Sequence, residues 1–209
     1  MTNQKGETMS QDILEIARGM NWKDIEMQIV MQCAPLIARL KLSNLLMAQN
    51  EDLSRIRQIL RRTGISYYVL AVTQKKTAML LYNRRQLEDY LARENVHQIL
   101  EDMGYTNMHL GEILFHFSKR YHNFVEGKQE FPHEMGLFLG YPVEDVIGFI
   151  ENDGENCLYT GYWKVYANLS EKKALFQKFE TAREHLIQLL SDGLGLVEIV
   201  QSYSLLPTT

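Results

Sequence analysis

The chain has few of the residues that would place it in a specialised class of protein. Only two of its 209 residues are cysteine, and they lie far apart and outside any CxxC pattern. They therefore predict no disulfide framework, and a reducing cytosol suits them. No apolar run approaches the roughly 18–20 residues that cross a bilayer, and the first ten residues are polar. We expect a cytoplasmic protein with no signal peptide and no membrane partner.

Positive charge is also scarce. The formal net charge is −4, and phosphate contacts require clustered Lys and Arg. Three basic pairs, Arg61-Arg62, Lys75-Lys76 and Arg84-Arg85, stand beside turns or helix ends, and we interpret them as solvated surface. We therefore expect no nucleic-acid partner. Neither GxGxxG after a strand nor GxxxxGK[ST] occurs, so a dinucleotide-binding domain and a P-loop enzyme are both excluded.

The composition that remains is that of an ordinary globular protein, with 45% hydrophobic and 23% charged residues. We predict a disordered N-terminus over residues 1–9 and a single α+β domain over residues 10–209. That domain is expected to be mostly helical, with a small mixed or antiparallel sheet built around a β-hairpin.

Hydrophobic periodicity, together with prolines, glycines and capping residues, predicts the elements of this domain. Residues 65–73 and 77–83 are β-branched and aromatic, and predict the hairpin. A strand is expected over residues 156–168, and the tail over residues 194–202 fits either a strand or a helix. The expected helices cover residues 11–19, 21 or 24 to 41 with a break at Pro35, 51–64, 84–105 with a break near Asn95, 109–127, 132–140, 142–154 and 171–193.

The stretch FPHEMGLFLGYPVEDVIGFIENDG, residues 131–154, interleaves two of the four prolines and four glycines with large apolar residues. Pro132 and Pro142 suit the first positions of two short helices, and Gly140 suits the stop between them. We predict that the two helices meet at a tight corner and form one wall of a site.

This stretch, together with CAPLIARLK and CLYTGYWKVY, resembles the bacterial domain of unknown function family 3793, from about Gln32 to the last helix. The resemblance implies a protein of anaerobic bacteria and suggests a link to iron or redox physiology. It assigns no activity and no known cofactor. The matching residues include Cys33, Lys41, Arg120, His133, Glu134, Tyr141, Tyr162, Lys164 and Tyr166.

Cys33 lies on an apolar helical stripe, which is typical of a core thiol. Alternatively, a helix restarting at Pro35 would stabilise a Cys33 thiolate as a nucleophile. His133 and Glu134 would either cap a helix start, or supply a general base and its orienting partner. Cys33, His133 and Glu134 are therefore the catalytic candidates, if the protein is an enzyme.

Strand geometry for GYWKVY would place Tyr162, Lys164 and Tyr166 on one face. A lysine between two tyrosines suits a carboxylate or phosphate, although its stem lying along aromatic rings is the simpler interpretation. A ligand-binding set follows by adding the other basic and aromatic residues of the family pattern: Lys41, Arg120, Tyr141, Tyr162, Lys164 and Tyr166.

His109, Glu112 and His116 share one helix face, but their spacing is neither HExxH nor ExxH. We assign no metal site to them and interpret them as a hydrated face.

Three functional hypotheses remain open. The first is a protein that binds a small anionic ligand or an iron- or redox-related cofactor in a pocket lined by FPHEMG and GYWKVY. The second is an enzyme for acyl transfer or thiol redox chemistry that uses Cys33 and His133. The third is a protein-interaction module that docks through GYWKVY or the tail. The oligomeric state stays open.

Overall fold

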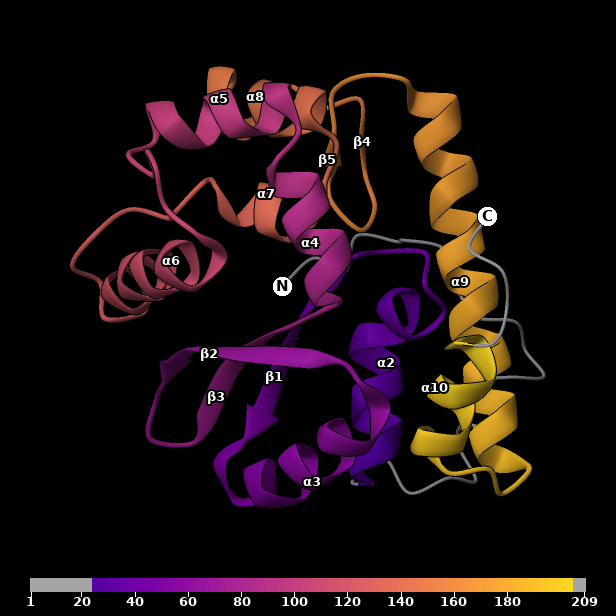
Figure 1. The fold of residues 1–209 in the computed structure, drawn as a ribbon. Helices are drawn as coiled ribbons and strands as arrows, with labels where there is room; N and C mark the ends of the chain where they lie inside the picture. The colour runs from indigo at the N-terminus through magenta and orange to yellow at the C-terminus, as the bar shows by residue number, and fades with distance from the viewer. Residues whose placement is uncertain (1–23, 205–209) are drawn as a thin grey trace.

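The computed structural model describes residues 24–204, so the expected disordered residues 1–9 and the expected helix over 11–19 lie outside the described residues. The strands are β1 (Ser43–Gln49), β2 (Ser66–Val72), β3 (Lys76–Tyr82), β4 (Tyr159–Thr160) and β5 (Lys164–Val165). The helices are α2 (Ile25–Ile37), α3 (Leu53–Thr63), α4 (Arg84–Leu91), α5 (Glu94–Asp102), α6 (Leu110–Val125), α7 (Met135–Phe138), α8 (Val143–Glu151), α9 (Leu169–Ser191) and α10 (Leu196–Ser204), with a single 3-10 turn, η1 (Asn50–Asp52). Figure 1 shows their arrangement.

The main sheet is antiparallel, with strand order β1-β3-β2. The central strand β3 is buried on both faces because its apolar side chains alternate between two cores. Ala78, Leu80 and Tyr82 belong to one core, whereas Met79 and Leu81 belong to the other. The β2–β3 hairpin confirms the prediction made from the sequence, and the fold confirms the α+β class with a small antiparallel sheet.

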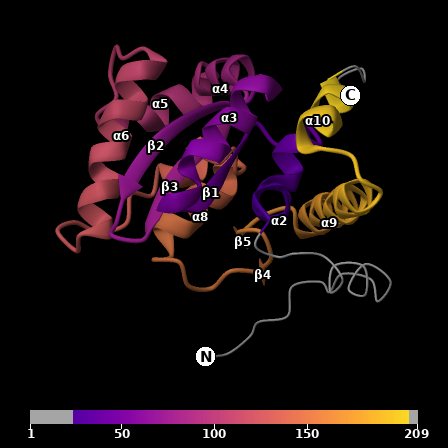
Figure 2. The ribbon, with the colours of Figure 1, turned by 90° about the horizontal axis from the view of Figure 1, so that it is seen from below.

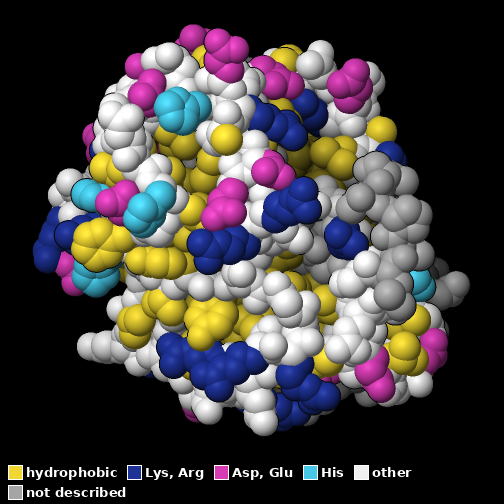
Figure 3. Space-filling model, viewed as in Figure 1, with side chains coloured by type: hydrophobic (Ala, Val, Ile, Leu, Met, Phe, Trp, Pro, Cys, Tyr) yellow, Lys and Arg dark blue, Asp and Glu magenta, His cyan; other side chains and the backbone are white. Residues whose placement is uncertain are grey.

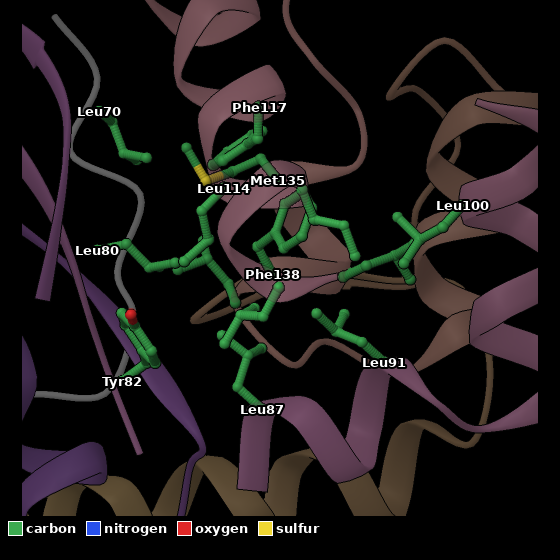
Figure 4. Close-up of a cluster of buried hydrophobic side chains, with 14 of the residues drawn as sticks. Leu70, Leu80, Tyr82, Leu87, Leu91, Leu100, Leu114, Phe117, Met135 and Phe138 are labelled. Carbon is green, nitrogen blue, oxygen red and sulfur yellow. The ribbon is translucent and has the colours of Figure 1, made fainter. Parts of the chain in front are cut away.

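The two cores give the molecule its layers. Helices α4 to α8 pack on one face of the sheet, and α2, α3, α10 and the end of α9 pack on the other. Seen from below in Figure 2, α6 lies on one side of the sheet and α2, α9 and α10 lie on the opposite side. Figure 4 shows the first core, where Leu80 and Tyr82 of the sheet face Leu87 of α4 and Phe138 of α7. A third, smaller cluster joins β5 to α9 through Trp163, Val165, Phe176 and Phe179.

Several helices match their expected limits. Asp24 caps α2 by accepting a hydrogen bond from the Glu26 amide, and α3 ends on Gly64 in the left-handed region, at φ 73°. Pro35 lies inside α2, where Cys33 leaves helical geometry at φ −125°. The expected break at this proline is therefore confirmed. Among the described helices, none combines the length and the apolar character that crossing a bilayer requires.

Other expectations are wrong. Strand β1 was not predicted from the sequence. The strand expected over residues 156–168 is instead a small hairpin of two-residue strands, because Gly161, Tyr162 and Trp163 form its turn. The tail, for which both a strand and a helix were left open, is a helix, α10, which buries Leu196 and Ile199.

Candidate functional site

A partly enclosed cavity of about 230 Å³ opens between the α7–α8 corner and the β4–β5 hairpin. Its wall is mostly apolar and aromatic, and it brings together the two sequence motifs that were expected to share a site. The lining residues are Phe131, His133, Met135, Gly136, Leu139, Tyr141, Asp145, Val146, Phe149, Trp163 and Lys164.

The corner that shapes the cavity depends on two glycines. Gly140 has φ 67°, in the left-handed region, and a Cβ there would lie 2.8 Å from Cγ of Leu42. Gly136 lets α8 approach, since a Cβ there would lie 2.8 Å from Val146. Pro142 is the cap residue before α8, which begins at Val143, and Pro132 precedes α7 by three residues, so neither proline occupies the first helical position that was predicted for it. The prediction of two short helices meeting at a tight corner is confirmed.

Asp145 ties α8 to the β4–β5 hairpin. Its buried carboxylate accepts hydrogen bonds from Trp163 Nε1 at 2.8 Å and from the backbone amides of Tyr166 at 2.8 Å and Ala167 at 3.1 Å. A carboxylate with three donors is well compensated for its burial. Asp145 therefore fixes the position of the β4–β5 hairpin relative to α8, on the two sides of the cavity.

Tyr141 and Trp163 form the floor between the two motifs. Their rings stack with centroids 4.8 Å apart and 26° between planes. The Tyr90 hydroxyl donates to the Tyr141 carbonyl at 2.9 Å, and burial raises the pKa of Tyr141 to about 12. Trp163 keeps only 8% of its surface exposed. Both rings are thus rigid wall elements, and Tyr141 stays a neutral phenol at physiological pH.

His133 is the polar group that the cavity leaves without a partner. Its ring lies between Phe131, at 6.1 Å, and Phe149, at 5.7 Å, measured between centroids. Nδ1 is buried and has no hydrogen-bond partner among the described residues. A buried nitrogen without a partner costs free energy, and in native proteins such a group usually has a specific reason.

Lys164 supplies the positive charge of the cavity. Its Nζ donates to the Gly154 carbonyl and lies 5.9 Å from the Phe149 ring centroid. An ammonium group has three donors, so this one bond leaves others for a second acceptor. Of the residues predicted from the sequence, His133, Tyr141 and Lys164 line the cavity together.

Glu134 and Arg120 lie elsewhere. The buried Glu134 carboxylate accepts from the Tyr105 hydroxyl at 2.8 Å and from Arg120 Nη1 at 2.9 Å, and Arg120 also donates to the Met103 carbonyl. Burial, together with the charge of Glu134, raises the pKa of Tyr105. This network joins α6 to the start of α7. It does not orient His133, and Arg120 does not line the cavity.

Cys33 lies in the core on the opposite face of the sheet, and Lys41 lies just before the edge strand β1. Cys33 is fully buried, and burial raises its thiol pKa to about 12, so the sulfur is protonated at neutral pH. Lys41 is 9% exposed, and burial lowers its pKa to about 8. Its Nζ lies 5.0 Å from the centroid of the Tyr141 ring. Lys41 thus contacts a residue of the cavity wall, whereas neither Cys33 nor Lys41 lines the cavity itself.

The face expected to carry Tyr162, Lys164 and Tyr166 does not form, because the segment turns at Tyr162. The Tyr162 hydroxyl donates to Glu180 of α9 at 2.8 Å. Tyr166 instead packs on α8, where a Cβ on Gly148 would lie 2.5 Å from the Tyr166 Cβ. Neither tyrosine lines the cavity.

His109 caps α6. Its Nδ1 accepts from the Glu112 amide at 3.3 Å, and Glu112 accepts from the His109 amide at 3.1 Å. This reciprocal capping accounts for two of the three polar residues on that helix face. Over residues 24–204, no three His, Cys, Asp or Glu side chains gather in a way that could hold a metal ion.

Sequence reasoning missed Phe149 and Trp163 as parts of the site. Both lie inside the motifs that were singled out, and the available signal was their proximity to His133 and Lys164 in the chain. A search for polar ligating groups passes over aromatic walls, although most of a small-molecule pocket is apolar surface.

The fold and the site define an α+β domain with a small, aromatic-walled cavity. Residues 29–200 match the family described as "Protein of unknown function (DUF3793)". Because the match covers most of the chain, this protein belongs to that family. No curated protein and no solved structure matches the chain.

Proposed function

We propose that this protein binds a small anionic ligand with a flat apolar body, in the cavity between the FPHEMG and GYWKVY motifs. The observation that carries the proposal is His133 in a mainly apolar and aromatic wall, where its buried Nδ1 has no partner among the described residues. A ligand atom that hydrogen-bonds Nδ1 would remove the cost of its burial. The Lys164 ammonium would pair with the anionic group.

The size of the cavity selects among the ligands expected from the sequence. A cavity of about 150 Å³ is enough to bind benzene, and pockets for drug-sized molecules run from about 300 Å³ upward. At about 230 Å³, this cavity suits a single ring carrying a carboxylate. Haem and flavin are larger than this volume, so the geometry favours the small anionic ligand over the redox cofactor.

The enzyme hypothesis needs a thiolate beside His133. Cys33 is fully buried, keeps its proton at neutral pH and does not line the cavity. We therefore give His133 a binding role. The interaction-module hypothesis needs an exposed aromatic surface on GYWKVY, and the tryptophan of that motif is buried against Tyr141 and Phe176.

Isothermal titration with benzoate, phenylacetate and benzyl alcohol tests the proposal. We expect the two acids to bind with a 1:1 stoichiometry and the neutral alcohol to bind more weakly. Lys164→Met should weaken benzoate binding by about tenfold or more while leaving benzyl alcohol within about twofold, because only the charged contact is lost.

Lys173→Met provides the matched control, since Lys173 is an exposed lysine of α9 that lies outside the cavity. A thermal melt of each variant establishes that it is folded. If no single-ring acid binds the wild type, or if Lys164→Met and Lys173→Met behave alike, the proposal fails. Stoichiometric binding of haem or flavin mononucleotide that depends on His133 would favour the redox cofactor instead.

A further inference from the structure

The charges of this protein are separated along the chain. Residues 53–85 contain eight Lys and Arg and no Asp or Glu, whereas the rest of the chain holds 14 Lys and Arg against 26 Asp and Glu. The net charge of −4 is therefore the sum of a strongly basic segment and a more acidic remainder of the chain. The basic residues are Arg55, Arg57, Arg61, Arg62, Lys75, Lys76, Arg84 and Arg85, and all eight are exposed. We refer to them as the basic surface.

Helix α3 is the centre of the basic surface and carries four of its arginines. Its buried stripe of Ile56, Ile59 and Leu60 fixes the helix on the sheet, so the arginines must point outward. Figure 3 shows Lys and Arg side chains gathered over α3. Among the described residues, no acidic side chain forms an ion pair with any of these four.

The remaining basic residues adjoin both ends of α3. At its start, the Asn50 amide donates to the Lys75 carbonyl at 3.0 Å, which holds the β2–β3 turn against η1. At its end, Thr63 and Gly64 share a small pocket with Asn83 and Gln86, which flank the Arg84-Arg85 pair. Arg84 and Arg85 are the only two of the eight that pair with acids, Glu88 and Asp89, within the part of the chain that the structure describes.

Contrary to the expectation drawn from the net charge and the isolated basic pairs, we infer that the basic surface binds the phosphate backbone of a nucleic acid. Six of its eight cations are arginine, whose planar group binds phosphate through two parallel hydrogen bonds. The other exposed residues of α3, Ser54 and Gln58, are also of the kind that contacts phosphate. The four arginines of α3 form no ion pair with an acidic side chain among the described residues, and a cluster of positive charge is the feature that phosphate binding requires.

Two other anionic partners fit less well. Membrane-surface helices insert apolar side chains beside their cations, and the exposed face of α3 has none. Interfaces between proteins rely on a buried apolar and aromatic centre, which this face also lacks. The inference is independent of the cavity, because none of the eight cations lines it.

Fluorescence anisotropy with a labelled 20-base-pair DNA duplex tests the inference. We expect binding that weakens with salt, with a slope of log K against log salt of about −4 if the four arginines of α3 each contact one phosphate. Arg61→Glu with Arg62→Glu should weaken binding at least tenfold and make the slope shallower by about 2. Both residues are exposed, so we expect the double variant to fold.

Lys173→Glu with Lys178→Glu on α9 changes the net charge equally, at two exposed lysines outside the basic surface, and should stay within about twofold of the wild type. The inference is overturned by an absence of duplex binding at 50 mM salt, or by equal losses in the two double variants. It is also overturned if polyglutamate displaces the duplex at equal charge concentration, which would indicate an acidic protein, or if phosphatidylserine vesicles bind in its place.

Discussion

The kink of α2 and the α7–α8 corner both place a reactive side chain beside an interrupted helix, and their environments differ in one respect. At the kink, Cys33 is fully buried in the core that α2, α3, α10 and the end of α9 form against the sheet. At the corner, two short helices cannot close over the β4–β5 hairpin, and His133 borders a cavity. A break in a helix is therefore not sufficient for a site, since the packing around the break decides whether a reactive group can be reached.

The two regions also treat buried charge differently. Asp145 beside the cavity has three hydrogen-bond donors, whereas Lys41 near the kink has the Tyr141 ring and no acidic partner among the described residues. The first is a compensated buried charge and the second is a costly one. This contrast leads to three measurable differences in stability and reactivity.

The largest effect is expected from removing the compensated charge. Asp145→Ala leaves one buried and two partly buried N–H groups without this acceptor, which should lower the free energy of unfolding by about 3 kcal/mol. Urea denaturation measures this change. Glu151→Ala on the same helix is the control, because Glu151 is exposed and should matter by less than about 0.5 kcal/mol. A similar small loss for both variants would mean that Asp145 does not hold the hairpin.

Removing the uncompensated charge of Lys41 should raise the free energy of unfolding. Burial lowers the pKa of Lys41 from 10.5 to about 8, so between these pH values the unfolded chain binds more protons and stability rises with pH. The cost is fully present below about pH 8. The gain in unfolding free energy from Lys41→Met should therefore be larger at pH 7 than at pH 10.5, by up to about 3 kcal/mol.

Denaturation of the wild type and Lys41→Met across this pH range measures the difference. The titration of Cys33, whose pKa rises from 9.0 to about 12 on folding, occurs in both proteins and largely cancels. Lys173→Met, at an exposed site, should show no such trend. A difference between wild type and Lys41→Met that is constant with pH would contradict the burial of this ammonium group.

The smallest effect concerns the thiols. At pH 8 iodoacetamide should modify Cys157, which is partly exposed, and leave Cys33 unmodified until the protein is unfolded in urea. Mass spectrometry of the digested protein measures both sites. Cys33→Ala should cost only about 1–2 kcal/mol, since it removes one buried sulfur. Rapid labelling of Cys33 in the folded protein would restore the enzyme hypothesis.

The contrast between the regions also shows how far prediction from sequence can go. The limits of α3 followed from hydrophobic periodicity and from Gly64, because those signals are local. Strand β1 escaped prediction because its leucines, methionine and alanine favour helix. It is a strand because it pairs with the free edge of β3. In that position Leu45 packs against one core, and Leu46 and Ala48 are buried in the other.

The candidate site was predicted only in part, because local sequence signals identify motifs but not the direction of each side chain. His133, Tyr141 and Lys164 lie in motifs whose proline and glycine content indicated a packed corner. Glu134 and Arg120 were assigned to that site as well, but their side chains point away from it. Glu134 accepts a hydrogen bond from Tyr105, and Arg120 donates one to the Met103 carbonyl. Neighbours in sequence, such as His133 and Glu134, can face opposite ways, and composition carries no information about that choice.

The sequence by itself determined the α+β class, the hairpin, the positions of the helix breaks and the family of this protein, because each depends on local pattern or on long matching motifs. The tertiary structure alone decided which polar groups share a cavity, which are sealed in the core, and that the basic residues of one segment gather around α3. Those outcomes depend on contacts between distant segments, and the free energy of such contacts is set by burial and packing rather than by neighbours along the chain.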